Sequence, residues 1–268
     1  MPAYLETIIA SHRAMAASDH RDLSQMIEQA SVQADRLSPD RRSFTDAIDR
    51  GAQEDGMAVI SEIKRRSPSK GDLDLTLDPA ELAMEYEGGG AACLSVLTDL
   101  EFFGGSPDDL RAARQACALP VLRKDFTVSA FDLCDAVAMG ADAVLLIVAA
   151  LEDRELRSLL ELAGRFSLAA LVEVHDAPDL ERALAAGARL VGVNQRDLRT
   201  FEVDHQRALA LGGMMPADVL AVAESGIRDA EDVSALADAG YQAVLVGETL
   251  VRSGDRRRAV AELRGVAP

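Results

Sequence analysis

Five charged side chains of the types used in acid–base catalysis stand at the ends of short apolar runs. Glu62 and Lys64 close the first run in alternating positions, so both side chains lie on one side of a predicted strand. Lys124, Glu173 and Glu224 stand at or directly after the ends of three later runs. A solvated position at the rim of a domain would explain any one of them alone. Five charges at one place would instead perturb each other's pKa values, as catalytic acids and bases do, and we therefore predict a shared site.

Lysine is scarce in this chain, which gives weight to the few lysines present. Only Lys64, Lys70 and Lys124 occur among 28 basic residues, and the others are arginines. A buried lysine can release its proton, whereas an arginine guanidinium stays protonated in proteins. Lys64 and Lys124 are therefore predicted to act through their ammonium groups. Lys70, in the loop after the first run, could be an ordinary charge.

Two kinds of segment alternate from about residue 57 onward. Apolar runs without polar alternation are typical of strands buried on both faces, and they predict strands over Met57–Ile63, Ala92–Leu97, Val121–Arg123, Ala143–Val148, Leu168–Glu173, Leu190–Val193, Val219–Ala223 and Ala243–Val246. The stretches between them have helical spacing, and they predict helices over Pro79–Glu87, Pro107–Cys117, Ala130–Met139, Asp153–Arg165, Ala177–Ala186, His205–Leu211, Asp229–Ala239 and Arg256–Arg264.

Glycines that end helices recur along the chain with a strand following each. Gly90, Gly140, Gly187 and Gly240 show this pattern at intervals of roughly fifty residues. Eight strand–helix units with a recurring module predict an α/β protein with a closed (βα)8 TIM barrel. The alternative is an open doubly wound sheet, which usually has fewer strands and a glycine-rich G-x-G-x-x-G turn. The sequence has no such turn, so we favour the barrel.

Residues 1–50 are predicted as an N-terminal helical extension packed on the barrel, and residues 51–268 as the catalytic domain. The length fits one large domain or two small ones. Two short amphipathic helices are predicted from the apolar positions Leu5, Ile8, Ile9, Met15, Leu23, Met26 and Ile27. Ser38–Asp40 predicts a loop before Phe44–Ile48. We expect the extension to cover one end of the barrel, and an independent binding segment is the alternative.

Composition excludes several functions. A net charge of −17 argues against nucleic acid as a partner. No apolar run approaches the roughly 18 residues that a membrane span needs, and no signal peptide is recognisable, so a cytoplasmic protein is expected. The three cysteines lack C-x-x-C spacing and the four histidines match no zinc template, so no metal is expected.

The same negative charge requires local positive charge if the ligand is an anion. In (βα)8 barrels the site lies at the carboxyl ends of the strands, where Asn194 and Arg196 also fall. The loops after the seventh and eighth strands commonly bind phosphate with a short extra helix, and here they contain Ser225, Gly226, Gly247 and Glu248. The alternative is that these glycines only turn the chain. For His175, the preferred interpretation is a loop start, and a catalytic role is the alternative.

Together these residues resemble the indole-3-glycerol phosphate synthase family. The resemblance covers nearly the whole chain, and its matching segments are Ile60–Ser69, Leu122–Phe126, Ala141–Ile147, Leu171–His175, Gly192–Leu198 and Val222–Ile227. It implies a small anionic phosphorylated substrate, 1-(2-carboxyphenylamino)-1-deoxyribulose 5-phosphate. The implied products are indole-3-glycerol phosphate, CO2 and water, with no metal or organic cofactor.

The resemblance also implies roles for residues. Lys124 would be the general acid that protonates the ketone, Glu173 the base for dehydration, and Lys64 an aid to hydroxyl departure or to binding of the anionic groups. Glu62 and Asn194 would orient these groups. The remaining expected contacts are Glu224 in the polar floor, Arg196 and Ser67 near the substrate carboxylate, and Phe103, Phe126, Leu145, Leu198 and Val246 around the anthranilate ring.

Two other functions stay open at the level of sequence. A Schiff-base aldolase of sugar phosphates would use Lys124 as its nucleophile. A catalytically silent phosphate-binding barrel would need none of the acid–base groups. Other enzymes of the tryptophan pathway are possible partners.

Overall fold

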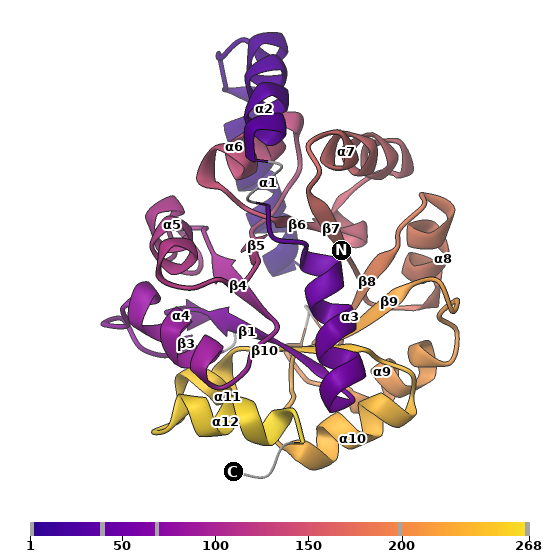
Figure 1. Ribbon diagram of the computed structural model, residues 1–268. Helices are drawn as coiled ribbons and strands as arrows, with labels where there is room; N and C mark the ends of the chain where they lie inside the picture. The colour runs from indigo at the N-terminus through magenta and orange to yellow at the C-terminus, as the bar shows by residue number, and fades with distance from the viewer. Residues whose placement is uncertain (1–2, 38–40, 68–69, 198–199, 266–268) are drawn as a thin grey trace.

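The computed structural model describes residues 3–37, 41–67, 70–197 and 200–265, and its centre is a closed barrel of parallel strands (Figure 1). In chain order the barrel strands are β1 (Ala58–Ile63), β4 (Cys93–Leu97), β5 (Val121–Lys124), β6 (Ala143–Ile147), β7 (Ala169–Val174), β8 (Leu190–Asn194), β9 (Leu220–Glu224) and β10 (Ala243–Val246). The first and last of these, β1 and β10, pair in parallel and close the barrel. The predicted (βα)8 barrel is confirmed, and the alternative of an open sheet is wrong.

A ring of helices surrounds the strands. These helices are α4 (Pro79–Gly88), α5 (Pro107–Ala116), α6 (Ala130–Met139), α7 (Asp153–Arg165), α8 (Ala177–Ala185), α9 (His205–Gly212), α10 (Ala230–Asp238) and α12 (Arg256–Leu263). Their ends agree with the sequence because local signals set them. For example, Asp78 accepts hydrogen bonds from the first amides of α4, and Gly140 ends α6 at φ +86°. No helix in the described parts of the chain is long and apolar enough to cross a membrane.

Three short elements lie outside this regular alternation. A hairpin of β2 (Arg66–Ser67) and β3 (Gly71–Asp72) follows β1, and a 3-10 helix follows β6 at Val148–Ala150. Neither was predicted, because segments this short leave no periodic pattern. The third is α11 (Glu248–Val251), a short helix directly after β10. It occupies the position of the short extra helix that accompanies phosphate sites in many barrels.

Apolar packing forms two layers around the sheet. One cluster fills the inside of the barrel, where Cys93, Leu122, Leu171 and Val222 are all fully buried. The other lies between the sheet and the surrounding helices. Because each strand faces apolar groups on both sides, its sequence is a continuous apolar run.

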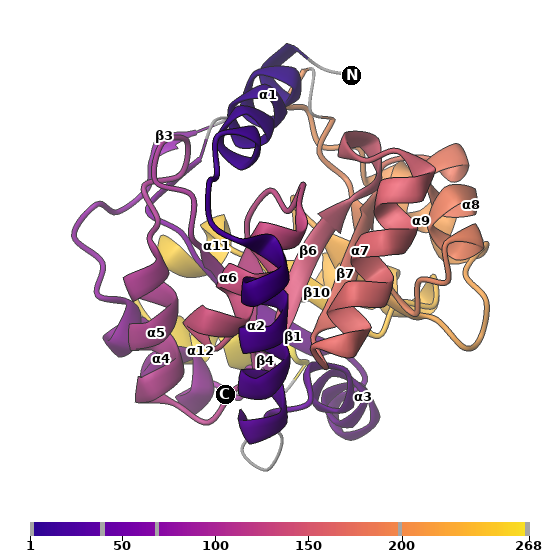
Figure 2. The ribbon, with the colours of Figure 1, turned by 90° about the horizontal axis from the view of Figure 1, so that it is seen from above.

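The N-terminal extension covers both ends of the barrel. Leu5 and Ile9 of α1 (Ala3–Ala17) and Ile48 of α3 (Phe44–Asp55) belong to the cluster inside the barrel. Figure 2 shows α1 and α3 at opposite ends of the barrel. Between them in sequence, α2 (Leu23–Leu37) packs beside α6 on the outside. Since α3 runs across residue 50, the division into an extension and a catalytic domain at that position stays a prediction.

Candidate active site

A pocket of about 750 Å³ opens at the carboxyl ends of the barrel strands, under α1. Sixteen of the residues predicted for the site line it, namely Glu62, Lys64, Ser67, Phe103, Lys124, Phe126, Leu145, Glu173, Asn194, Arg196, Glu224, Ser225, Gly226, Val246, Gly247 and Glu248. The remaining prediction, Leu198, lies outside the described residues. The fold thus brings together side chains that are far apart in the sequence.

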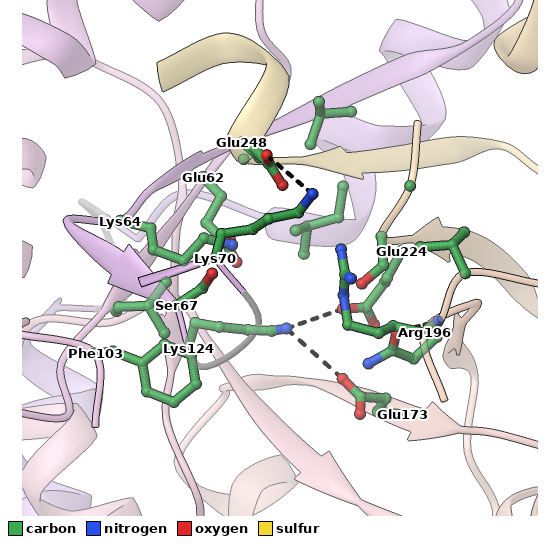
Figure 3. Close-up of a pocket in the computed structure, with 18 of the residues that line it drawn as sticks. Glu62, Lys64, Ser67, Lys70, Phe103, Lys124, Glu173, Arg196, Glu224 and Glu248 are labelled. Carbon is green, nitrogen blue, oxygen red and sulfur yellow. Dashed lines mark hydrogen bonds and ion pairs between the residues drawn. The ribbon is translucent and has the colours of Figure 1, made fainter. Parts of the chain in front are cut away.

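Lys124 lies in the middle of the charged groups (Figure 3). It ends β5, and its Nζ is 3.0 Å from Oε2 of Glu224 and 3.6 Å from Oε2 of Glu173. Burial of the ammonium lowers its pKa, but the carboxylates of Glu224, Glu173 and Glu62 outweigh burial and raise the pKa of Lys124. The side chain therefore carries its proton before any ligand arrives.

Glu62 and Lys64 form a second ion pair at the end of β1. Lys64 Nζ donates to Oε1 of Glu62, and Ser95 Oγ donates to the other carboxylate oxygen at 3.4 Å. Burial raises the pKa of Glu62, yet the ammonium groups of Lys64 and Lys124 outweigh burial, and the net pKa is lowered. Glu62 is therefore an anion that fixes the position of Lys64.

Glu224 is a buried carboxylate of this cluster with a raised pKa. Burial, together with the negative charge of Glu173, raises its pKa to about 7 even though Lys124 opposes the change. Its Oε1 is buried without a hydrogen-bond partner among the described residues. A Cβ at Gly192 on the adjacent β8 would lie 2.1 Å from this oxygen, so the glycine makes room for the carboxyl group.

The end of β8 adds amide and guanidinium groups. Asn194 accepts a hydrogen bond from the backbone N–H of Arg196, and the Arg196 guanidinium donates to the carbonyl of Phe201. Gln195, between them, is not among the residues that line the pocket but contacts two that do. Its Nε2 donates to the carbonyl of Ser225, and its Oε1 lies 3.2 Å from Nδ1 of His205. Gln195 thus holds the loop after β9.

The loops after β9 and β10 form the basic side of the pocket. Ser225 and Gly226 both have positive φ, 68° and 76°, which turns the chain sharply after Glu224. Arg228 and Arg252 line the pocket nearby, and neither was singled out from the sequence. Lys70 also lines it, with its Nζ 3.8 Å from Oε1 of Glu248 (Figure 3). The sequence signal for both arginines was their place in the two loops already assigned to phosphate.

Gly247 leaves space for the Glu62–Lys64 ion pair as well as for a ligand. A Cβ at this position would lie 2.5 Å from Oε1 of Glu62 and 3.1 Å from Nζ of Lys64. Any side chain here would displace both groups. A substitution of Gly247 would therefore test the Glu62–Lys64 pair and an anion site at the same time.

An apolar wall faces the charged groups. Phe103 and Phe126 lie with their ring centroids 6.1 Å apart, and Leu145 and Val246 complete the predicted part of this wall. The sequence missed the contribution of the extension, since Tyr4, Leu5 and Ile8 of α1 also line the pocket. Their apolar spacing predicted a packed helix but not the cavity that it covers. A flat apolar group would fit between this wall and the charges.

His12 of α1 meets two aspartates beside the pocket. Its Nε2 is 3.0 Å from Oδ2 of Asp99 and 3.9 Å from Oδ1 of Asp125. The sequence suggested only scattered histidines, but the three ligand-type atoms lie within 4.8 Å of one another. Hydrogen bonds already use these carboxylates, because Asp99 accepts from two backbone amides and Asp125 from Arg123. We therefore interpret the group as a link between α1 and the barrel.

The fold and the pocket define a (βα)8-barrel protein with the charged groups of an acid–base enzyme. A model described as indole-3-glycerol phosphate synthase matches residues 5–263, and the chain belongs to this family.

Relatives of similar length carry the same name. The indole-3-glycerol phosphate synthase of Mycolicibacterium vanbaalenii is 48% identical over 97% of this chain and 93% of its own. That of Kineococcus radiotolerans is 55% identical over 80% of this chain and 78% of its own. Among solved structures, a 3-hexulose-6-phosphate synthase matches with a TM-score of 0.60 at 19% identity, over 79% of this chain and all of the other, which shows the shared fold.

Proposed function

We propose that the chain converts 1-(2-carboxyphenylamino)-1-deoxyribulose 5-phosphate to indole-3-glycerol phosphate, CO2 and water. Membership of the synthase family supports this reaction. The observation that carries it is the protonated Lys124 held between Glu173 and Glu224, opposite an aromatic wall. An ammonium group in this position can supply a proton to the substrate ketone, and the wall can hold the anthranilate ring.

The chemistry proceeds in three steps. As the aromatic carbon attacks the ketone carbon, Lys124 gives its proton to the ketone oxygen, which becomes a hydroxyl group. Loss of CO2 then returns the bonding electrons to the ring and restores its aromatic character. In the last step Glu173 removes a proton while Lys64 assists departure of the hydroxyl as water. Glu173 and Lys64 line the same pocket.

Other lining residues bind and orient the substrate in this proposal. Glu62 holds Lys64, Asn194 orients the hydroxyls, and Glu224 shapes the polar floor beside Lys124. Arg196 and Ser67 contact the substrate carboxylate. Phe103, Phe126, Leu145 and Val246 surround the anthranilate ring. Backbone groups of Ser225, Gly226, Gly247 and Glu248 contact the phosphate, where Arg228, Arg252 and Lys70 supply the positive charge.

The raised pKa of Lys124 argues against a Schiff-base aldolase. A lysine nucleophile must first lose its proton, and three carboxylates oppose that loss here. Treatment with borohydride in the presence of a keto-sugar phosphate should therefore leave no covalent adduct on Lys124.

A silent phosphate-binding barrel would gain nothing from the buried charged cluster, which is costly to maintain without a function. We further propose a cytoplasmic location and contacts with other enzymes of the tryptophan pathway.

The test supplies the carboxyphenylamino substrate and follows the fluorescence of the indole product. The parent chain should turn over without added metal or cofactor. Glu173→Gln should keep substrate affinity within about tenfold of the parent and lower kcat by roughly 10²–10⁴, as for loss of a positioned base. Turnover of this variant near the parent rate would remove Glu173 from the mechanism, and an inactive parent would refute the proposed function.

A further inference from the structure

His175 has a position that the proposed reaction does not use. It follows the carboxyl end of β7, two residues after Glu173, and 14% of its side chain is exposed. Both ring nitrogens are buried, and neither has a hydrogen-bond partner within the described parts of the chain. Buried polar groups of this kind are uncommon in native proteins and are often found where a site needs them.

The imidazole lies between two carboxylates on different sides of the barrel wall. Its Nε2 is 3.5 Å from Oε1 of Glu173, which lines the pocket. Its Nδ1 is 3.9 Å from Oδ2 of Asp179 on α8. Both separations are slightly longer than a hydrogen bond, as catalytic contacts often are before substrate binds.

Asp179 connects this pair to the outside of the molecule. Its Oδ1 lies 3.6 Å from Nη1 of Arg182, and 33% of the Arg182 side chain is exposed. By contrast, the Glu173 side chain is only 4% exposed. The chain Glu173, His175 and Asp179 therefore runs from the buried floor of the pocket to solvent through titratable groups.

Burial keeps the ring of His175 neutral at neutral pH, because it lowers the pKa of the imidazole more than the neighbouring carboxylates raise it. Burial lowers the pKa of the imidazole, and Arg207 lowers it further, while Asp179, Glu224 and Asp176 oppose them less strongly. A neutral imidazole can accept a proton at one nitrogen and release one from the other. No other side-chain type does this near neutral pH with so little change of structure.

We infer that His175 returns Glu173 to its ionised form between turnovers by passing its proton to Asp179. This inference rests on the proposed function, in which Glu173 ends the dehydration step as a neutral acid. The O–H bond of Glu173 breaks as an N–H bond forms at Nε2. The imidazolium then releases the proton on Nδ1 to Asp179, which loses it to water. Tautomer exchange of the ring, by which Nε2 loses its proton and Nδ1 gains one from water, returns His175 to its starting form before the next turnover. His175 touches no reacting atom, so it is a positioning residue that acts through Glu173.

Rapid mixing of enzyme and substrate separates this role from a structural one. The proposed reaction begins with Glu173 as a base, so the first turnover of His175→Gln should stay within about twofold of the parent. Later turnovers must wait for Glu173 to lose its proton, and the steady-state rate should fall at least about tenfold. His20→Gln, at an exposed histidine, is the matched control and should change neither phase. Equal slowing of both phases, or an unchanged steady state, would overturn the inference.

Two further measurements keep the test decisive. Small imidazoles should restore the steady-state rate of His175→Ala. If they act as proton carriers, the rescued rate should depend on the pKa of the imidazole. If they only filled the space of the missing ring, the rescued rate would not depend on that pKa. An NMR titration of His175 needs no substrate. Its pKa should be lower in Glu173→Gln than in the parent, since the variant removes an anion 3.5 Å away. An unchanged pKa would overturn the relay, whereas an inactive parent would refute only the proposed reaction.

Discussion

Lys124 shows how the field around one residue decides its chemistry. A lysine in an apolar pocket would lose its proton easily, but here three carboxylates more than offset burial. The Lys124 amine is therefore protonated, as a general acid must be before it reacts. Its surroundings make release of that proton harder, so the ketone must approach closely before transfer occurs.

The first prediction concerns the ammonium group itself. Lys124→Arg keeps the positive charge between Glu173 and Glu224 but removes the general acid, because the guanidinium does not release its proton in a protein. We expect the variant to bind a product analogue and to lose at least roughly 10²-fold in single-turnover rate. Calorimetry and rapid quenching would measure the two quantities.

Lys70→Arg is the matched control. Lys70 lies at the edge of the pocket near Glu248, and its side chain is half exposed. An arginine at this position preserves the positive charge that Lys70 supplies to the pocket. Its turnover should fall much less than that of Lys124→Arg. If Lys124→Arg turned over at the parent rate, positive charge alone would be sufficient at that position.

At the scale of elements, α1 converts an open barrel end into a covered pocket. Leu5 and Ile8 supply apolar lining, while His12 joins the helix to Asp99 and Asp125. Burial lowers the pKa of His12, but the hydrogen bond to Asp99 and the charge of Asp125 outweigh it, so the net pKa is raised. The link between helix and barrel therefore depends on protonation.

The second prediction follows from the sign of that shift. Because the folded pKa of His12 lies above its unfolded value, its stabilisation is fully present below pH 6.5 and is lost as pH rises through the folded pKa. Relative to His12→Gln, the parent should be more stable by roughly 1–2 kcal/mol near pH 5.5. The difference should shrink above neutral pH.

Denaturant unfolding at several pH values would measure the difference between the two proteins. Comparison with His12→Gln cancels the contribution of Glu224, which has the same sign, because its raised pKa also weakens folding as pH rises from about 4.5 to 7. Hydrogen exchange in α1 would locate the effect on the helix. A stability gap that is constant from pH 5 to 9 would contradict the assignment.

At the scale of the whole molecule, the barrel and most of the site were predictable from sequence. Buried parallel strands leave continuous apolar runs, and the closed topology places every strand end at one mouth, so Glu62 and Glu224 could be assigned together. The positions of Arg228 and Arg252 depend on how two loops turn, which no periodicity encodes. The meeting of His12 with Asp99 depends on tertiary docking of α1, which local sequence does not determine.

The last prediction concerns the effect of the net charge of the molecule on substrate binding. The molecule carries −17, so its long-range field repels an anionic substrate, while Lys70, Arg228 and Arg252 attract it inside the pocket. The Debye length shortens from about 30 Å at 0.01 M salt to about 10 Å at 0.1 M. Salt in this range therefore weakens repulsion by distant carboxylates more than it weakens attraction at contact distance. We expect kcat/KM to rise roughly two- to fivefold over this range, with kcat unchanged.

The matched variant for this prediction is Arg252→Gln, which removes one local cation and leaves the distant charge nearly intact. Its kcat/KM should be lower than that of the parent at every salt concentration, because a short-range attraction is missing. Its increase with salt should persist, because the global repulsion that salt relieves is still present. A steady fall of kcat/KM from 0.01 to 0.1 M salt in the parent would show that the basic side of the pocket dominates the field even at long range.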